Sequence, residues 1–233
     1  MAPRPDLADL LTRAAREINA RGDLDATLTA VVQCLHAALP AGHHVSLCLQ
    51  RRPGVVETAA VSADLVHELE RAQHDGDQGT CPAALAGREV ALADRVQQRD
   101  DWERYHPVAV QHGVRAQLSV RLTGAERSWG TLNVYAVDGA EGISPATERL
   151  TTLFATHAAL AVERAHREEN LRAALDTRRR IGQALGLAMA RFELDEDLAF
   201  RYLVRLSSTS NVKLRDIAEE LVEEANRKAN SGA

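Results

Sequence analysis

The sequence predicts an α+β domain, with an antiparallel sheet flanked by helices, followed by a small all-α domain of three helices, the two joined by a long helix. Three observations carry this prediction. Apolar and polar residues alternate over 45–50 and 116–122, as on the two faces of a half-buried strand. Apolar residues recur every three or four positions over 150–181, without Gly or Pro. The last sixty residues repeat this helical spacing in three separate stretches.

Two helices begin the predicted α+β domain. Residues 5–20 and 24–39 carry leucine, isoleucine and valine at helical spacing, and Gly22 and Asp23 separate them. Two strands, 45–50 and 55–61, follow and are joined by the turn dipeptide Pro53-Gly54, so we expect a hairpin. The later elements are, in order, helix 65–72, a helical turn at Cys81-Pro82, strand 89–93, helix 102–111 and strands 116–122 and 129–137.

Composition limits the class of protein. A chain of 233 residues that is 45% hydrophobic can bury one core of ordinary size and a second, smaller one. The net charge of −5 argues against a protein that coats nucleic acid through bulk electrostatics. Cys34, Cys48 and Cys81 are far apart and come with no signal peptide, so we expect reduced thiols in a cytoplasmic protein. No stretch approaches the roughly 20 apolar residues that span a bilayer.

The long helix is predicted to begin at Pro145. Its apolar positions up to Ala161 are satisfied if the helix packs on its own sheet, but residues 165–175 lie outside both predicted cores. We therefore expect a coiled-coil connector that pairs two chains into a homodimer. Thirty helical residues span roughly 45 Å, which is enough to carry a rotation or register change between the domains. The alternative is a helix that packs on its own sheet and then ends.

Three amphipathic helices are predicted at the C-terminal end. Asp195, Glu196 and Asp197 suit the start of the second helix, because acids complement the free N–H groups there. The polar run 207–211 should end that helix, with Ser210 or Asn211 capping the third. The expected buried residues are Ile181, Leu185, Ala188 and Phe192, then Ala199, Phe200, Leu203 and Leu206, then Leu214, Ile217, Ala218, Leu221 and Val222.

A second face of the first helix is not required by packing. Arg180, Ala184, Leu187 and Arg191 also recur at steps of three and four, so two arginines bracket a small, flat patch. Charge is segregated along this domain: residues 172–191 contain five arginines and one aspartate, a net +4, whereas residues 216–224 contain five acids and no base. Such segregation is typical of a module with one binding face.

These C-terminal residues resemble the ANTAR family, whose members bind RNA and act as transcription antiterminators. The resemblance implies an RNA partner made of tandem stem-loops with six-base loops, and loop bases are accessible to protein because they are not paired. Gln183-Ala184-Leu185-Gly186 departs from the family, because Leu185 stands where a lysine is expected, which should weaken RNA affinity or its salt dependence. The matching residues are Arg180, Ile181, Ala184, Gly186, Met189, Arg191, Ala199, Phe200, Leu203, Ser207, Asn211, Leu214, Ile217 and Ala218.

The candidate RNA-binding residues fall into three groups by chemistry. Cationic side chains would meet phosphates or stack on bases, polar side chains would bond base edges, and small residues would permit close approach. Each has a structural alternative, since the arginines can be solvated and Ser210 or Asn211 can act only as a cap. The groups are Arg180, Arg191, Arg201, Arg205, Lys213 and Arg215; Ser207, Ser210 and Asn211; and Ala184 and Gly186.

The N-terminal part resembles a GAF domain, in particular that of actinobacterial GAF-ANTAR regulators, over about residues 20–165. The resemblance rests on the order of the elements and on GDQGTCPAALAGREVALAD, VRAQLSVRL and SWGTLNVYAVDG. It implies a sensor with a small-molecule ligand whose identity the sequence does not give. The domains are then expected at 1–165 (GAF, with N-terminal helices), 166–175 (helical connector), 176–228 (ANTAR) and 229–233 (disordered tail).

Gly79, Cys81 and Trp102 are the candidate ligand-binding residues, because the loop 75–87 should face the GAF pocket. Cys81 at a helix start could be a reactive thiol, although free cysteines more often pack as small buried residues. Trp102 also suits a packing role. A haem would need His106 or His112 as an axial ligand, and no second ligand spacing supports it. His43 and His44 have no partner carboxylates, so we expect no metal site there, and we expect none elsewhere in the chain.

No enzyme signature emerges, since P-loop, GxSxG and HExxH motifs are absent from the sequence. The leading hypothesis is therefore a ligand-responsive antiterminator. The alternative is a signalling module whose ANTAR-like domain docks a protein instead of RNA, as its acidic last helix would allow. Duplex DNA ranks last, because an acidic third helix is poorly suited to the major groove.

Overall fold

The computed structural model describes residues 23–231 except 53, 126 and 138, so the helix expected over 5–20 lies outside the described residues. The chain forms two compact units, residues 1–165 and 166–233. Helix α6 (Pro145–Phe192) contributes to both. In the described part of the chain, no helix combines the length and apolar character needed to cross a bilayer.

The first unit is built on a five-stranded sheet with the order β2-β1-β5-β4-β3. Every neighbouring pair is antiparallel, which confirms the predicted α+β class and the hairpin of β1 with β2. At Gly130 the strands β1 and β5 approach so closely that a Cβ would lie 1.8 Å from the Cys48 carbonyl oxygen. The strands are β1 (His43–Arg52), β2 (Val55–Val61), β3 (Val90–Ala93), β4 (Ala116–Thr123) and β5 (Ser128–Ala136).

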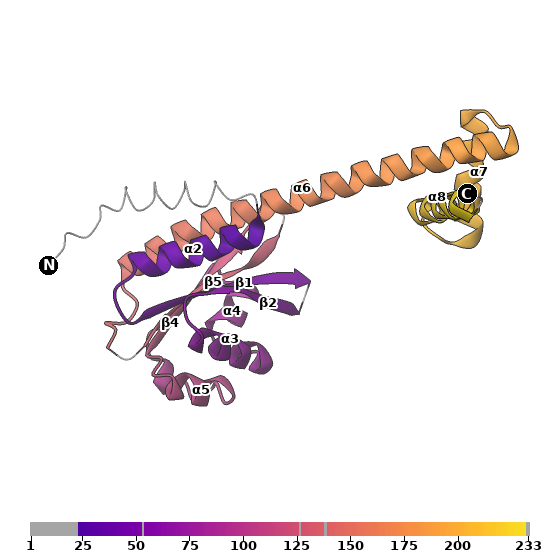
Figure 1. The fold of residues 1–233 in the computed structure, drawn as a ribbon. Coiled ribbons are helices and arrows are strands. Elements are labelled where there is room, and N and C mark those ends of the chain that lie inside the picture. Colours follow the sequence, from indigo (N-terminus) through magenta and orange to yellow (C-terminus); the bar gives the residue numbers. More distant parts are fainter. Residues whose placement is uncertain (1–22, 53, 126, 138, 232–233) are drawn as a thin grey trace. The chain divides into compact units, whose positions relative to one another are not determined.

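One face of the sheet is covered by α2 (Leu24–Ala38) and by the first part of α6 (Figure 1). Leu28, Val31 and Leu35 recur at helical spacing on α2 and are fully buried against the strands. Phe154 and Ala158 on α6 join the same core. The apolar side chains of the alternating strands therefore point to this face of the sheet and pack against α2 and α6.

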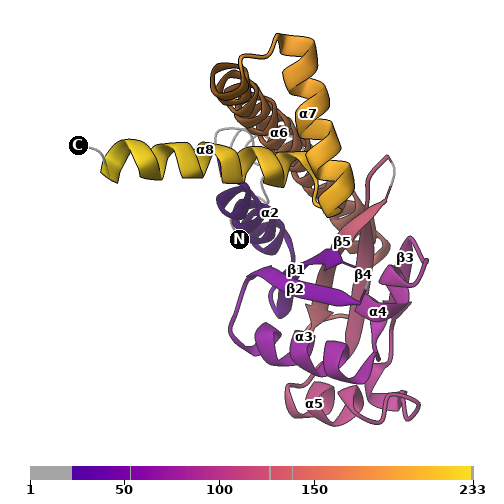
Figure 2. The same ribbon diagram turned by 90° about the vertical axis from the view of Figure 1, so that its right-hand side faces the viewer.

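The opposite face carries α3 (Leu65–Gly76), α4 (Thr80–Leu85) and α5 (Tyr105–Gln111), as Figure 2 shows for α3 and α5. A one-turn 3-10 helix, η1 (Val96–Gln98), precedes α5, which begins three residues later than expected. Here the strands present polar side chains to the helices, and these are fully buried: Ser46, Gln117, Ser119, Thr131 and Asn133. A buried polar layer thus lies on this face beside a second apolar core, which includes Leu69, Trp102 and Tyr105.

The second unit packs the end of α6 against α7 (Glu196–Ser210) and α8 (Leu214–Ser231). Its centre consists of Ala184, Leu203 and Ala218, all fully buried, with Ile217 beside them. The predicted helix start is confirmed, because the Asp195 side chain accepts a hydrogen bond from Leu198 N at 2.8 Å.

Three details of this unit differ from expectation. Phe200 is 46% exposed, because Ala199 and Leu203 face the core and the next residue along a helix turns about 100° away. Phe192, at the end of α6, is 44% exposed. The run 207–211 does not break α7 early: the helix continues through Ser210, and Asn211 ends it in the left-handed conformation (φ 54°) instead of capping α8.

Helix α8 also extends further than the expected end of the domain. It continues to Ser231, so residues 229–231 of the expected tail are helical, and residues 232 and 233 lie outside the described residues. The continuation follows from the sequence, which contains no Gly or Pro between Leu214 and Ser231.

Candidate functional site

The two arginines that bracket the predicted patch on α6 both contact α8. Arg180 Nη1 lies 3.0 Å from Glu219 Oε1, and Arg191 Nη1 lies 3.9 Å from Glu224 Oε1. Ala184 between them is fully buried against Leu203 and Ala218, which corrects its assignment to an exposed patch. The spacing that suggested a free face instead serves the contact with α8, so Ala184 is a core residue.

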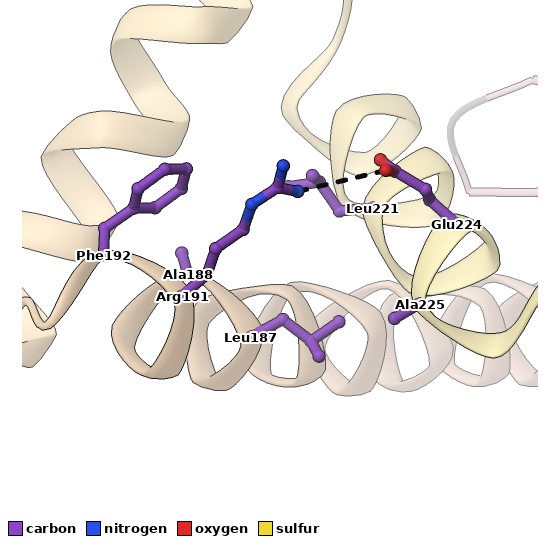
Figure 3. Close-up of a pocket in the computed structure, with 7 residues that line it drawn as sticks. All are labelled: Leu187, Ala188, Arg191, Phe192, Leu221, Glu224 and Ala225. Carbon is purple, nitrogen blue, oxygen red and sulfur yellow. Dashed lines mark ion pairs between the residues drawn. The ribbon is translucent and has the colours of Figure 1, made fainter. Parts of the chain in front are cut away.

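A pocket of about 340 Å³ lies beside this contact and is lined mostly by apolar side chains. In Figure 3, Arg191 reaches from α6 toward Glu224 on α8. Leu187 and Phe192, two of the exposed large hydrophobic residues, lie on the α6 side. The lining residues are Leu187, Ala188, Arg191, Phe192, Leu221, Glu224 and Ala225.

Helix α7 carries cations that are not neutralised in this way. Arg201 and Arg205 are exposed and four residues apart, so they lie on one face of the helix, and Lys213 is exposed in the turn before α8. Within the described residues, none of these three forms an ion pair with a carboxylate. Arg215, by contrast, pairs with Asp216 at 3.0 Å. We call Arg201, Arg205 and Lys213 the α7 cations.

The small and polar candidates have mixed surroundings. Gly186 is exposed on α6, and a Cβ placed there would meet nothing within 4 Å. Ser210 Oγ donates to the Leu206 carbonyl at 2.7 Å, and Ser207 Oγ donates to the Val212 carbonyl at 2.6 Å. Asn211 is exposed at the end of α7. Gly186 and Asn211 are thus open to a ligand, whereas the two hydroxyl groups already have backbone acceptors.

In the first unit, Gly79 and Trp102 line one pocket of about 310 Å³, next to Arg99. The guanidinium of Arg99 lies 4.1 Å from the centre of the Trp102 ring. Gly79 has φ +107°, and a Cβ there would lie 2.2 Å from Gln73 Oε1, so only glycine fits. Cys81 does not line this pocket: it is fully buried, on the polar side of the sheet.

A hydrogen-bonded network fills that polar side. Glu70 on α3 is fully buried, and its Oε1 accepts from Tyr135 Oη at 2.6 Å and from Asn133 Nδ2 at 2.8 Å. Gln73 Oε1 accepts from Cys81 N at 3.2 Å. It also accepts from Gln117 Nε2 at 2.8 Å. The network connects α3 and α4 to three strands.

Two thiols and a histidine belong to the same network. Burial raises the pKa of the Cys48 thiol well above its usual value, whereas a hydrogen bond with Cys48 lowers the pKa of Cys81 to about 7. Burial alone would lower the pKa of His74, but the neighbouring Cys81 and Glu70 raise it to about 10. Burial would raise the pKa of Glu70, yet His74, Ser46 and Tyr135 hold it below its usual value. Glu70 is therefore an anion inside the domain.

The histidines considered for haem have other contacts. His106 Nε2 lies 3.1 Å from the Gln97 carbonyl oxygen, and His112 Nε2 lies 2.9 Å from Glu68 Oε2. Neither lines either of the two pockets described above. What the sequence analysis missed is the convergence of Cys48, Glu70, His74 and Cys81; the four-residue step from Glu70 to His74 was its only signal.

Comparison with known proteins identifies both halves. A model of the GAF domain matches residues 23–162, and a model of the ANTAR domain matches residues 169–222. The chain is similar to the GAF domain from Acinetobacter phosphoenolpyruvate-protein phosphotransferase (17% identity, TM-score 0.54, covering 70% of this chain and 96% of that one). It is also similar to the GAF domain from a phosphoenolpyruvate-protein phosphotransferase from Coxiella burnetii (16% identity, TM-score 0.55, covering 72% of this chain and 99% of that one). These two likenesses show the fold alone. No curated protein matches the chain.

Proposed function

Because the chain belongs to the GAF domain family and carries an ANTAR domain after it, we propose that it is a ligand-responsive RNA-binding regulator that acts as a transcription antiterminator. ANTAR domains are RNA-binding antiterminator modules, and GAF domains bind small ligands. The proposal places the protein in the cytoplasm and includes no catalytic step. We also propose that the protein is a GAF-ANTAR regulator of the actinobacterial type.

The observation that carries the RNA proposal is the pair Arg201 and Arg205 on one exposed face of α7, unneutralised by any carboxylate in the described structure. Phosphate binding depends on such cations, because each contact releases counterions from the nucleic acid. Five acids of the domain lie on α8 and four lie over 193–197, around the start of α7; two of the α8 acids pair with α6. With Lys213 at the end of α7, these cations form a local basic surface on an acidic chain.

The first test is a filter-binding titration of the full-length protein against a tandem RNA with six-base loops, with scrambled-loop RNA as the control. We expect loop-dependent binding that weakens about tenfold or more in the double variant R201A/R205A. If both arginines contact phosphate, the plot of log association constant against log salt concentration becomes less steep in the double variant, by about 1.4 to 1.8 in slope.

The matched control removes the same charge elsewhere. Arg51 and Arg52 are exposed at the end of β1, so R51A/R52A lowers the net charge equally without touching the ANTAR domain. An equal loss of affinity in both double variants would show a general charge effect and contradict the α7 surface. No binding by folded wild-type protein would contradict the RNA proposal for the unliganded form.

A protein partner is the second candidate, and one observation favours it. The pocket between α6 and α8 is mostly apolar, and Leu187 and Phe192 beside it are exposed. Such a pocket suits an apolar side chain of a docked protein better than a phosphate. The same titration separates the candidates, because a protein-docking domain would show no dependence on the RNA loops.

We also propose a homodimer held by the connector. Leu171 and Leu175 in the connector are exposed and four residues apart, and before the connector Leu153 and Leu160 on α6 are exposed and seven apart. Exposed leucines at these spacings are typical of a helix with a partner. Sedimentation of the purified protein at micromolar concentration tests this, and a mass of one chain would contradict it.

A further inference from the structure

Four potential metal ligands converge on the polar side of the GAF sheet. They are Cys48 on β1, Glu70 and His74 on α3, and Cys81 at the start of α4, and one ligand atom from each lies within 4.8 Å of all the others. The four-residue step from Glu70 to His74 places both on one face of α3. The two cysteines come from two other elements, so only the tertiary fold brings them to that face.

The Glu70 carboxylate is satisfied on one oxygen only. Its Oε1 accepts hydrogen bonds from Ser46, Asn133 and Tyr135, which saturate that atom. Its Oε2 forms an ion pair with Nε2 of His74 at 3.4 Å, and neither of these two buried atoms has a hydrogen bond. Buried polar atoms are nearly always hydrogen-bonded, and an ion held by Oε2 and Nε2 would replace this long ion pair with two direct ligand bonds.

The donor set fits a zinc-like ion. In a tetrahedral site with bonds of about 2.0 to 2.3 Å, ligand atoms are about 3.3 to 3.8 Å apart, so atoms separated by the full 4.8 Å need to approach by about 1 to 1.5 Å. Two thiolates with an imidazole and a carboxylate select such an ion over Mg²⁺ or Ca²⁺. Outer contacts are also present: Thr131 Oγ1 lies 3.2 Å from Cys81 Sγ, and Asn133 Nδ2 lies 3.7 Å from Cys48 Sγ.

We propose that Cys48, Glu70, His74 and Cys81 bind one Zn²⁺-like divalent ion. The site departs from our expectation of no metal, and it neither requires nor implies RNA binding. An ion enters from a pocket of about 510 Å³ that His74 lines together with Pro82, and the His74 side chain is 21% exposed. Binding displaces the protons of both thiols and joins α3 and α4 to β1 through one atom.

The test is a Co²⁺ titration of the full-length protein, stripped of metal with a chelator and kept reduced with a phosphine. Tetrahedral Co²⁺ bound by thiolates gives charge-transfer absorption in the ultraviolet and strong visible bands. We expect saturation at one Co²⁺ per chain and loss of the spectrum when Zn²⁺ is added. C48S and C81S should each weaken Co²⁺ binding by about 100-fold or more, beyond the effect of losing an outer-shell partner.

C34S is the matched control, because Cys34 lies on α2, across the sheet from the cluster, and this variant should keep the full spectrum. H74A provides a second test in case the buried cysteine variants misfold, since the His74 side chain is partly exposed. We expect H74A to bind Co²⁺ more weakly while its circular dichroism is unchanged. Two results would overturn the site: reduced wild-type protein that binds no stoichiometric Co²⁺, or C48S and C81S spectra identical to that of C34S. Neither depends on RNA.

Discussion

Glu219 on α8 lies 3.0 Å from Arg180 on α6, measured between Oε1 and Nη1, and both side chains are partly exposed. The acidic helix thus neutralises a guanidinium that, under the proposed function, is a candidate for RNA phosphate. Glu224 approaches Arg191 in the same way, at 3.9 Å. An RNA that uses either arginine competes with a carboxylate of the same domain, which makes α8 a built-in limit on affinity.

Release of Arg180 should strengthen RNA binding. Glu219→Gln removes the competing carboxylate, and we expect a few-fold rise in affinity with less than about 1 kcal/mol lost in stability, because exposed ion pairs contribute little. Glu220→Gln is the control, since it removes the same charge at an exposed neighbouring position. An equal rise in both variants, measured by filter binding, would attribute the effect to net charge and not to Arg180.

Arg191→Ala should weaken hairpin binding and leave helicity intact. The side chain is 58% exposed and its approach to Glu224 is loose, so its loss should cost the fold less than about 1 kcal/mol. A gel-shift titration and far-ultraviolet circular dichroism measure the two effects separately. Unchanged affinity would remove Arg191 from the RNA site.

Gly186→Ala should stabilise the domain yet weaken RNA binding. Alanine in an exposed helix is favoured over glycine by about 0.5 to 1 kcal/mol, and here the added methyl group meets no protein atom within 4 Å. If RNA approaches Gly186 closely, that methyl group blocks it. Gly182→Ala, at an equally open position, should stabilise without the loss of affinity. Equal affinities for all three proteins would exclude close approach at Gly186.

Ala184→Leu should destabilise the ANTAR domain by about 1 to 3 kcal/mol, because Ala184 is fully buried and three added carbons overfill its site. Ala190→Leu adds the same volume at an exposed position of α6 and should change stability little. Chemical unfolding followed by circular dichroism compares the two. A stable Ala184→Leu protein that lost only RNA binding would restore Ala184 to the RNA surface.

The double variant L171E/L175E should convert the proposed dimer into monomer. Leu171 is 62% exposed and Leu175 is 59% exposed, so neither supports the core of a single chain, and glutamates there would repel each other across a paired helix. Sedimentation velocity gives the mass. A wild-type protein that dimerises and a double variant that dimerises equally well would place the dimer contact elsewhere.

Local patterns predicted most of the fold. The segment 55–61 was expected as a strand and β2 occupies Val55–Val61, because alternation over 45–50 and the turn dipeptide after it define a hairpin locally. The start of α7 at Glu196 followed from Asp195 in the same way. Phe200 shows the limit: helical spacing gives the possible faces of a helix, and the neighbouring helix decides which one is buried.

Site residues were harder to predict, because their roles depend on contacts between distant segments. Arg180 and Arg191 have the spacing of a free surface, and only the packing of α8 shows that Glu219 and Glu224 reach them. The metal-ligand cluster was invisible for the same reason, since Cys48 and Cys81 are 33 positions apart and share no motif. Composition gave the acidic balance of the chain but not where the cations remain unpaired.

The strand order has a consequence for synthesis of the chain. Strand β1 pairs with β5, and their nearest partners, Leu49 and Gly130, are 81 positions apart in the sequence. At about 5 to 20 residues per second, a ribosome needs about 4 to 16 s to make that interval. During this time the β1–β2 hairpin has an open edge with an apolar face, which is the kind of surface that joins other nascent chains. The GAF half is therefore most exposed to such association before β5 is made.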